Sequence, residues 1–188
     1  RLSLTPVTPG SSRVVEFVAA WDALSPRLAA AAASNPSRWT NGNGNGGGNG
    51  GDNSGGNREM LLSALKLAIP RLQQIPPAPG SGGRPIHERA VEVTLALVDL
   101  GMDAECMSAG LLREALVAGT VTLDEIEFHL GPGVMRLAHD CERLHRLPRR
   151  VGSYDDATAE RLRTFCLTFH DVRAVVVELA CRVDALRH

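Results

Sequence analysis

The sequence predicts an all-α fold, a helical bundle of about seven or eight helices. Apolar residues recur every three or four positions through most of the chain, which is the spacing of one face of a helix. Capping residues, glycines and prolines divide this pattern into segments of helix length. No alternating strand pattern bounded by turns is present, and the valine-rich run VRAVVVEL lies inside a long helical period.

The first part of the chain predicts a tail, a helix and a linker. Residues 1–11 contain two prolines and a glycine and are expected to be disordered. Residues 12–33 carry an apolar stripe that an alanine run continues, which predicts a helix. Ser25 followed by Pro26 resembles a helix start and would divide this segment into two short helices. Residues 34–57 are rich in Gly, Asn and Ser and predict a flexible linker, because they cannot bury enough apolar area to offset their chain entropy.

Residues 58–188 are expected to form one helical domain. Pro70 is expected to kink or end its first helix, and Asp103 can cap a later one. Thr122 and Glu125 have the spacing of a capping box, in which each side chain bonds the other residue's backbone N–H. The expected helices run from Met60 to Leu72, His87 to Leu100, Asp103 to Ala118, Thr122 to Gly131 and Val134 to Leu147, followed by a pair from Asp155 or Asp156 to the C-terminus with a break near His170 and Asp171.

Composition excludes several classes of function. The net charge is −1, which gives no global bias toward nucleic acid or an anionic membrane. No apolar run approaches the roughly 20 residues of a membrane span. The four cysteines lie far apart without CxxC spacing, which indicates free thiols in a reducing compartment. The sequence starts at Arg1, which is expected of a fragment or a processed chain. Its first residues include no acid and are rich in Ser, Thr and Pro. This composition fits the end of an organelle transit peptide and equally an ordinary disordered terminus.

Four motifs occur in a fixed order in the helical domain. GRPIHERAVEVT begins at Gly83, LLREALVAG at Leu111, TLDEIEFHLG at Thr122 and HDVRAVVVELACRVDALRH at His170. In frame and order they resemble the GxPYxxHPxxVA, LLHDxxEDT, TLEDI and DIRVVLIKLADRLHNMR motifs of the N-terminal HD domain of the RelA/SpoT family, the enzymes of the alarmone (p)ppGpp. The residues within these motifs are most similar to those of the plant calcium-activated RelA/SpoT homologues (CRSH). Those proteins are chloroplast (p)ppGpp synthetases with a degenerate HD region, a synthetase domain and EF-hands.

The resemblance implies that the catalytic residues of the hydrolase are missing. An arginine side chain keeps its proton and cannot bind a metal cation. The family's guanosine-side motif is also replaced, by IPRLQQIPPAPGSGG. We therefore expect no catalytic and no metal-binding residue in this chain. The family's first metal histidine falls on Arg89, its His-Asp pair on Arg113 and Glu114, its acid/base pair on Val117 and Ala118, and its last metal aspartate on Cys181.

Other histidines, aspartates and cysteines are not expected to take part in catalysis or metal binding. The pairs His139-Asp140 and His170-Asp171 fall outside the metal frame of the family, and we expect surface or capping roles for them. His139, Cys141 and His145 lie at offsets of two and six, so on a helix they point in different directions. Cys181 is either a redox thiol of a chloroplast protein or a core cysteine.

The function implied by the resemblance is a non-catalytic HD-like region, a pseudo-hydrolase that scaffolds and regulates a calcium-activated (p)ppGpp synthetase (GTP diphosphokinase) in the chloroplast. The synthetase domain of the same polypeptide would be its partner, and no nucleic acid or membrane partner is expected. This chain would need no cofactor, whereas the parent would use Mg and ATP for synthesis and Ca at its EF-hands. Two alternatives stay open: a residual metal-dependent (p)ppGpp phosphohydrolase, and a stand-alone helical interaction module. The oligomeric state is not predicted.

A guanidinium in place of the family's metal cation also predicts an ion pair. Glu114 is the natural acceptor, and Arg89, on a facing helix, is the expected donor. Arg113 is adjacent to Glu114 in sequence and is less well placed to face it. The alternative is that all three side chains point into solvent.

Overall fold

The computed structural model describes residues 9–34, 54–77, 83–146 and 171–187, and all regular secondary structure in these residues is helical. The predicted all-α class is therefore confirmed. The helices are α1 (Pro9–Ser34), α3 (Ser54–Leu72), α4 (Ile86–Asp99), α5 (Ala104–Val117), α6 (Leu123–Leu130), α7 (Pro132–His145) and α9 (Arg173–Arg187). Within this part of the chain, no helix is both long and apolar enough to cross a membrane.

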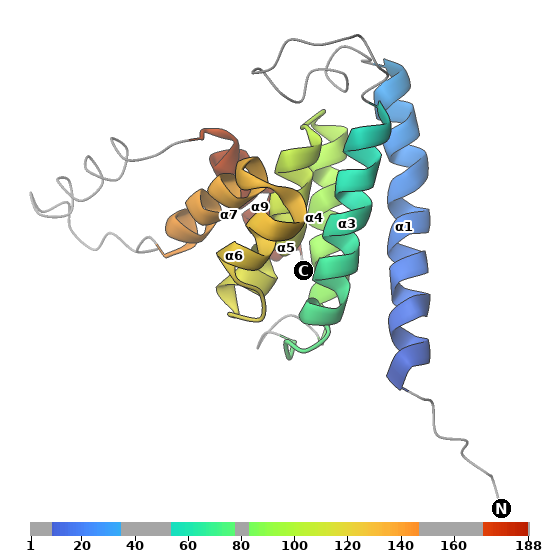
Figure 1. Cartoon of the computed structure of the whole chain (residues 1–188), viewed down its shortest axis with the longest axis vertical. Helices are drawn as coiled ribbons and strands as arrows, with labels where there is room; N and C mark the ends of the chain where they lie inside the picture. Colours follow the sequence, from blue (N-terminus) through green and yellow to red (C-terminus); the bar gives the residue numbers. More distant parts are fainter. Residues whose placement is uncertain (1–8, 35–53, 78–82, 147–170, 188) are drawn as a thin grey trace, which may run out of the picture.

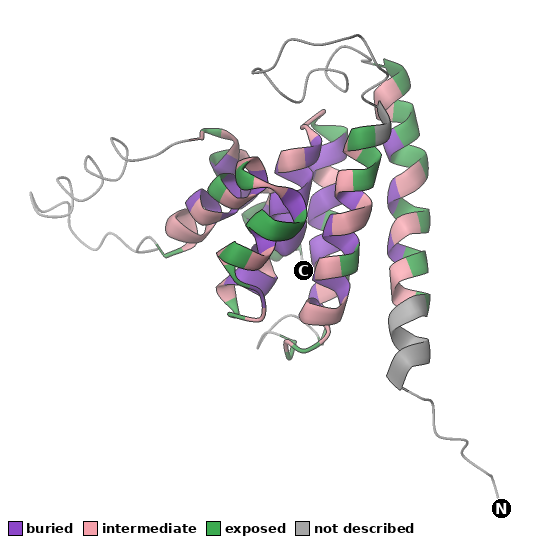
Figure 2. Cartoon of the chain, viewed as in Figure 1, coloured by how far each residue is buried: buried purple, intermediate pink, exposed green. Residues whose placement is uncertain are grey.

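Helix α5 lies at the centre of the bundle and contacts α3, α4, α7 and α9 (Figure 1). Nearly all of its side chains are buried, because it has neighbours on every side (Figure 2). Helix α6 packs on α7 and α3, and α9 packs on α4, α5 and α7. A central helix of this kind brings side chains from three or four elements to one place, which a peripheral helix cannot do.

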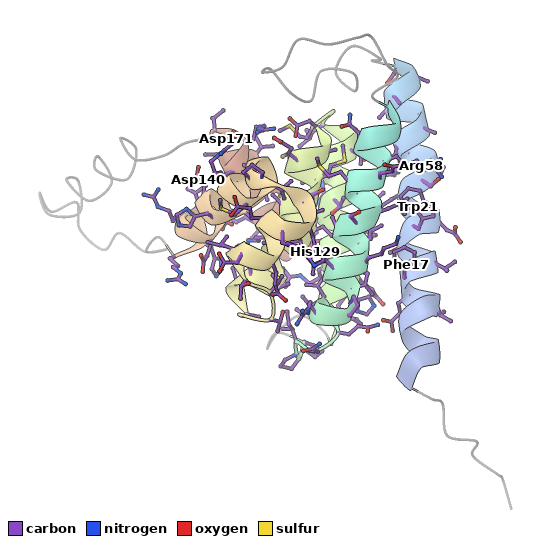
Figure 3. All side chains as sticks on the ribbon, in the orientation of Figure 1. Phe17, Trp21, Arg58, His129, Asp140 and Asp171 are labelled. Atoms are coloured by element: carbon purple, nitrogen blue, oxygen red, sulfur yellow. The ribbon has the colours of Figure 1, made fainter. Side chains whose placement is uncertain are left out.

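Helix α1 is docked on the bundle along α3 and α4 and is not a separate segment. Ala20, Leu24 and Leu28 form its buried face. Arg58 of α3 stacks on the ring of Trp21 with its guanidinium carbon 5.1 Å from the ring centroid (Figure 3). The predicted division at Ser25 and Pro26 is wrong, because α1 runs through Pro26 without a break.

The exposure of Pro26 explains why α1 continues. Proline removes the hydrogen bond to the carbonyl four residues earlier, here that of Asp22. Pro26 and Asp22 are both on the solvent side of α1, so water can reach that carbonyl. The helix also starts earlier than predicted, at Pro9, where the missing N–H of proline costs nothing.

The second linker boundary also differs from the prediction. Helix α3 begins at Ser54, so the last four residues of the predicted linker are helical; residues 35–53 lie outside the described residues. Pro70 lies inside α3, in its final turn, and the helix ends two residues later at Leu72. The long segment from Asp155 to His170 also lies outside the described residues.

Local capping chemistry sets the ends of the central helices as the sequence predicts. The Asp103 carboxylate accepts a 2.9 Å hydrogen bond from the Cys106 N–H at the start of α5. Thr122 and Glu125 form the predicted capping box at α6. The Thr122 N–H holds the pKa of Glu125 below its usual value. Gly131 then ends α6 at a positive φ of 87°, a conformation that favours glycine.

Candidate functional site: a vacated pocket filled by ion pairs

The positions where the family would hold its metal do converge in the structure. Arg89 comes from α4, Arg113 and Glu114 from α5, and Cys181 from α9. The charges of these arginines and of Glu114 all act on the Cys181 thiol, which places them around one point. We call this region the vacated pocket and define it as Arg89, Arg113, Glu114, Cys181 and two acids of α9, Glu178 and Asp184.

Arg113 occupies the centre of the vacated pocket. Its side chain is only 6% exposed, and its guanidinium donates to Glu178 twice, from Nε at 3.1 Å and from Nη2 at 2.7 Å. The other end of the guanidinium donates from Nη1 to Glu114. The Nη2 atom also lies 2.7 Å from Nδ1 of His145 on α7. Arg113 therefore ties α5 to α9 and α7 through one planar cation.

The electrostatics keep Arg113 charged in spite of its burial. Burial alone would lower the pKa of Arg113, but the carboxylates of Glu114 and Glu178 reverse this, and the pKa lies above its usual value. The Cys181 thiol adds no negative charge near neutral pH, because its own pKa is raised to about 12. A permanent cation between two carboxylates satisfies those acids, and it repels a metal ion from the same position.

A second ion cluster lies six residues further along α9, more than one and a half helical turns from Glu178. Asp184 is buried and accepts from Arg84 at 3.2 Å and from Arg89 at 3.2 Å. The predicted pair of Arg89 with Glu114 is therefore wrong in its partners: Arg89 bonds Asp184, and Glu114 bonds Arg113. Arg113 reaches both Glu114 and Glu178 because the flexible stem lets opposite ends of the guanidinium face different helices.

Sequence reasoning missed the two acids that decide this geometry. Glu178 and Asp184 lie on the buried stripe of α9 together with Ala174, Val177 and Cys181. Each of them lies three residues from Cys181, on either side of it, which is close to one helical turn. Two carboxylates on an otherwise apolar stripe were the available signal, since a buried acid needs a cationic partner.

The remaining vacated positions have no polar group to contribute. Val117 is the last residue of α5 and is half-buried, and Ala118 is the exposed residue that follows it. Neither can transfer a proton, so the acid/base pair of the family has no counterpart at these positions. Burial raises the pKa of Cys181 to about 12, which favours an unreactive core cysteine over a redox thiol.

Of the two His-Asp pairs, one has a buried structural role. Asp140 is fully buried and accepts the backbone N–H of Asp171 at 3.1 Å, so of the expected surface or capping roles its burial excludes the surface role and leaves the capping one (Figure 3). Asp171 in turn accepts the backbone N–H of Arg173 at 2.9 Å and so opens α9, as predicted. His170 lies outside the described residues. Arg173 also donates to Asp103 and Glu105 of the α5 start, which fixes α9 against α5.

The His139, Cys141 and His145 set does not assemble. Cys141 is buried and His145 points to Arg113, while His139 is half-buried on another side of α7. Among the described residues, no three His, Cys, Asp or Glu side chains gather so that they could hold a metal ion. The donor set of the vacated pocket, two arginines with their paired acids, does not fit the family's metal.

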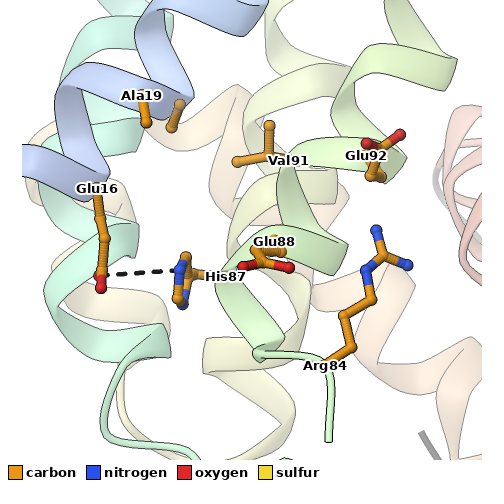
Figure 4. Close-up of a pocket in the computed structure, with 8 residues that line it drawn as sticks. Glu16, Ala19, Arg84, His87, Glu88, Val91 and Glu92 are labelled. Carbon is orange, nitrogen blue, oxygen red and sulfur yellow. Dashed lines mark ion pairs between the residues drawn. The ribbon is translucent and has the colours of Figure 1, made fainter. Parts of the chain in front are cut away.

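A groove of about 680 Å³ lies between α1 and α4, next to the vacated pocket (Figure 4). His87 Nε2 lies 3.8 Å from Glu16 Oε2 across it. Arg84 lines the groove and also pairs with Asp184. Glu88 and Glu92 add acids along the α4 wall. These side chains are of mixed charge and include no nucleophile beside a base, so the groove does not indicate a reaction.

A scan of protein families matches the HD domain to residues 64–188, more than half of the chain. The chain therefore belongs to the HD-domain family. The match begins six residues inside the predicted 58–188 domain.

The chain is also similar to plant chloroplastic GTP diphosphokinases, which confirms the resemblance predicted from the four motifs. It is 36% identical to GTP diphosphokinase CRSH1, chloroplastic, of Oryza sativa subsp. japonica over 97% of this chain and 27% of the relative. It is 34% identical to the probable GTP diphosphokinase CRSH, chloroplastic, of Arabidopsis thaliana over 98% of this chain and 28% of the relative. The chain thus spans about a quarter of the length of these relatives, and the alignment includes α1.

Proposed function

We propose that this chain is the catalytically silent HD-domain region of a chloroplast (p)ppGpp synthetase, a GTP diphosphokinase. Its role is to hold a rigid helical scaffold against the synthetase part of the same polypeptide and to regulate it. One observation supports the proposal: Arg113, at a position that the resemblance assigns to a metal ligand, has a buried guanidinium that is paired with Glu178. The similarity to plant CRSH proteins along nearly the whole chain supports the identity of the parent.

The finer parts of this proposal come from the resemblance. Calcium activation through EF-hands, Mg and ATP for pyrophosphate transfer, and the synthetase domain all concern residues other than these 188. The relatives are named chloroplastic, which supports the same location for this chain. The scaffold role follows from chemistry: where the metal ligands and the acid/base pair are replaced by Arg89, Arg113, Val117 and Ala118, only binding and packing remain.

The runner-up function is a residual metal-dependent (p)ppGpp phosphohydrolase. Glu114, Glu178 and Asp184 keep three carboxylates near the pocket, which is the observation in its favour. Each of them is bonded to arginine, so a metal would have to displace buried ion pairs. The stand-alone interaction module is the third candidate, and a synthetase domain in the full-length product would reject it.

Metal analysis separates the first two functions. Protein purified in the presence of Mn²⁺ is desalted, and its metal content is measured against protein concentration. The proposal expects far less than one Mn or Zn per chain. The control variant Arg113→His with Cys181→Asp restores two ligand types of the family and should retain more metal than the native chain, if it folds. One tightly held metal per native chain would contradict the proposal and favour the phosphohydrolase.

A further inference from the structure

The groove between α1 and α4 has charged groups toward both ends. Glu16 of α1 and His87 of α4 meet at one end, 3.8 Å apart (Figure 4). Arg84 and Glu92 lie toward the other end. The volume of about 680 Å³ is within the range of small-molecule sites in proteins, about 300–1,000 Å³. This distribution of charge fits an elongated small molecule with a charged group at each end.

Two acids on the α4 wall of the groove have no partner in the described part of the chain. Glu88 and Glu92 lie four residues apart on α4 and are exposed. Neither forms a hydrogen bond or an ion pair with another described residue. Like charges at this spacing on a helix repel each other. A cation between them would remove this repulsion, so the α4 wall is suited to an ammonium group.

Arg84 supplies the opposite charge on the same wall. Its side chain is only 17% exposed, and its guanidinium donates from Nη1 to Asp184 at 3.2 Å. A guanidinium has five N–H donors, and no other described residue accepts one from Arg84. Because Arg84 lines the groove, its remaining donors can bind a carboxylate there.

The other residues that line the groove are apolar. Ala19 and Ala20 of α1 and Val91 of α4 form an apolar strip that can cover an aliphatic chain. The charges around this strip are not balanced. Three carboxylates line the groove, against one histidine and one arginine that Asp184 already neutralises. The groove therefore favours a ligand of net positive charge that also carries an anionic group for the arginine.

We propose that the groove between α1 and α4 binds a free basic α-amino acid of the lysine class. Arg84 holds the α-carboxylate, and Glu88 and Glu92 hold the α-ammonium. The aliphatic chain lies along the apolar strip, and the terminal ammonium reaches the Glu16 carboxylate. A nucleotide would meet the same carboxylates with its own negative charges and be repelled. The inference goes beyond the proposed function and does not depend on it, since it uses none of the positions that the resemblance assigns to catalysis.

A titration followed by the NMR amide shifts of the purified chain tests this site, with L-lysine as the probe. We expect saturable shifts at Ala19 and Val91 with a dissociation constant of the order of 1 mM, since the ligand is small and most of its contacts are near solvent. All titrations are made at one ionic strength, because salt screens exposed charges.

Three analogues of lysine each lack one charged group and test one end of the site each. Cadaverine lacks the carboxylate and should bind about tenfold more weakly, because it loses the charge-assisted bonds to Arg84. 6-Aminohexanoate lacks the α-ammonium, and Nε-acetyl-lysine lacks the terminal ammonium. Each of these two should bind about three- to fivefold more weakly, since the carboxylates that they would leave are partly or fully exposed.

Two variants locate the ligand. Arg84→Gln should weaken lysine binding about tenfold and leave cadaverine binding unchanged, because cadaverine has no carboxylate to lose. A variant that merely disturbed the fold through Asp184 would weaken both ligands. Glu92→Gln, at an exposed position, should weaken both ligands about three- to fivefold. The matched control Glu127→Gln, exposed on α6, should bind lysine as the native chain does.

Three results would overturn the proposal. The first is the absence of saturable shifts below about 20 mM L-lysine, well above the expected dissociation constant. The second is cadaverine binding as tightly as lysine, which would indicate only a general attraction of cations to exposed acids. The third is native affinity for lysine in both Arg84→Gln and Glu92→Gln, which would place the binding elsewhere on the chain.

Discussion

Among the side chains of the pocket, Arg113 has the largest electrostatic effect on the folded state, because its charge is buried and cannot be neutralised. Glu178 accepts two hydrogen bonds from its guanidinium and is itself buried. We expect Glu178→Gln to lower the free energy of unfolding by about 3 kcal/mol, the lower end of the cost of stranding a buried charge, since Glu114 still pairs with Arg113. Chemical denaturation measures this loss.

Matched variants show whether that loss comes from the stranded charge. Glu127→Gln, on the exposed side of α6, should change stability by less than about 0.5 kcal/mol. Removing both charges together, with Arg113→Met and Glu178→Leu, should recover part of the loss, because both fully buried charges are then gone and only the half-buried Glu114 loses a partner. A double variant less stable than Glu178→Gln by the full cost of a second substitution would argue against the ion-pair explanation.

Arg89 tests the corrected pairing. A double-mutant cycle with Arg89→Ala and Asp184→Ala should show a coupling energy above about 0.5 kcal/mol, since the two side chains are bonded and mostly buried. The same cycle with Arg89→Ala and Glu114→Ala should be additive within about 0.3–0.5 kcal/mol. Coupling in the second cycle and additivity in the first would restore the pairing predicted from the sequence.

The sequence identified the positions of the pocket but not the partners within it. Arg89, Arg113, Glu114 and Cys181 could be placed together because a resemblance carries the spacing of whole helices. The partner of Arg89 depends on which face of α9 meets α4, and this is set by packing far along the chain. The buried stripe that contains Glu178 and Asp184 would have predicted acids inside the bundle, though not which arginine each one meets.

At the scale of the helices, the predictions that rest on local chemistry hold and those that depend on context fail. The Asp103 cap and the Thr122–Glu125 box are formed by residues within one turn, so sequence alone determines them. The break at Pro26 was predicted from the same kind of signal. It fails because water can reach the Asp22 carbonyl on the exposed side of α1, while the opposite side of the helix is docked on α3 and α4.

The start of α9 should be sensitive to acid. Burial raises the pKa of Asp171, but the hydrogen bonds from Arg173 lower it by more than burial raises it. The folded pKa therefore lies below the usual 3.8. A depressed pKa stabilises the folded state fully above pH 3.8, and this contribution is lost as the pH falls through the folded pKa. Asp171→Asn keeps a cap acceptor and removes only the charge.

Urea denaturation at about pH 6 and about pH 3 tests this sign. Wild type should be more stable than Asp171→Asn at the higher pH, and the difference should shrink at the lower pH. Asp22→Asn, on the exposed side of α1, is the control and should give no comparable trend. A stability difference that stays constant or grows as the pH falls would contradict the assignment.

Helix α1 should stay bound after the chain is cut. The Gly/Asn-rich run predicted as a linker should be cleaved by protease within residues 35–53, because such a sequence cannot pack. The two fragments should nevertheless co-elute in gel filtration, since Ala20, Leu24 and Leu28 are buried against the bundle. Leu24→Asp should release the fragment after cleavage, and Ala23→Asp, on the exposed side, should not. Resistance of the run to protease would indicate that it is folded or bound.

Considered as a whole molecule, the chain matches the HD-domain family over residues 64–188, and buried ion pairs join its helices where α4, α5 and α9 meet. Three helices supply the residues of the vacated pocket, ion pairs join α5 to α9 and α4 to α9, and Arg113 of α5 also contacts His145 of α7. Charge–charge contacts replace the link between helices that a bound metal would supply. Under the proposed function, these ion pairs would keep the scaffold rigid.

The most direct test of this account is a (p)ppGpp hydrolysis assay with Mn²⁺ on the purified chain. Loss of the general acid/base pair alone lowers a rate by about 10²- to 10⁴-fold, and loss of the metal removes the activated water as well. The account predicts that pyrophosphate release does not exceed that of a heat-killed control. Manganese-dependent release above that control, abolished by substituting Glu178 or Asp184, would contradict the claim that the pocket is vacated.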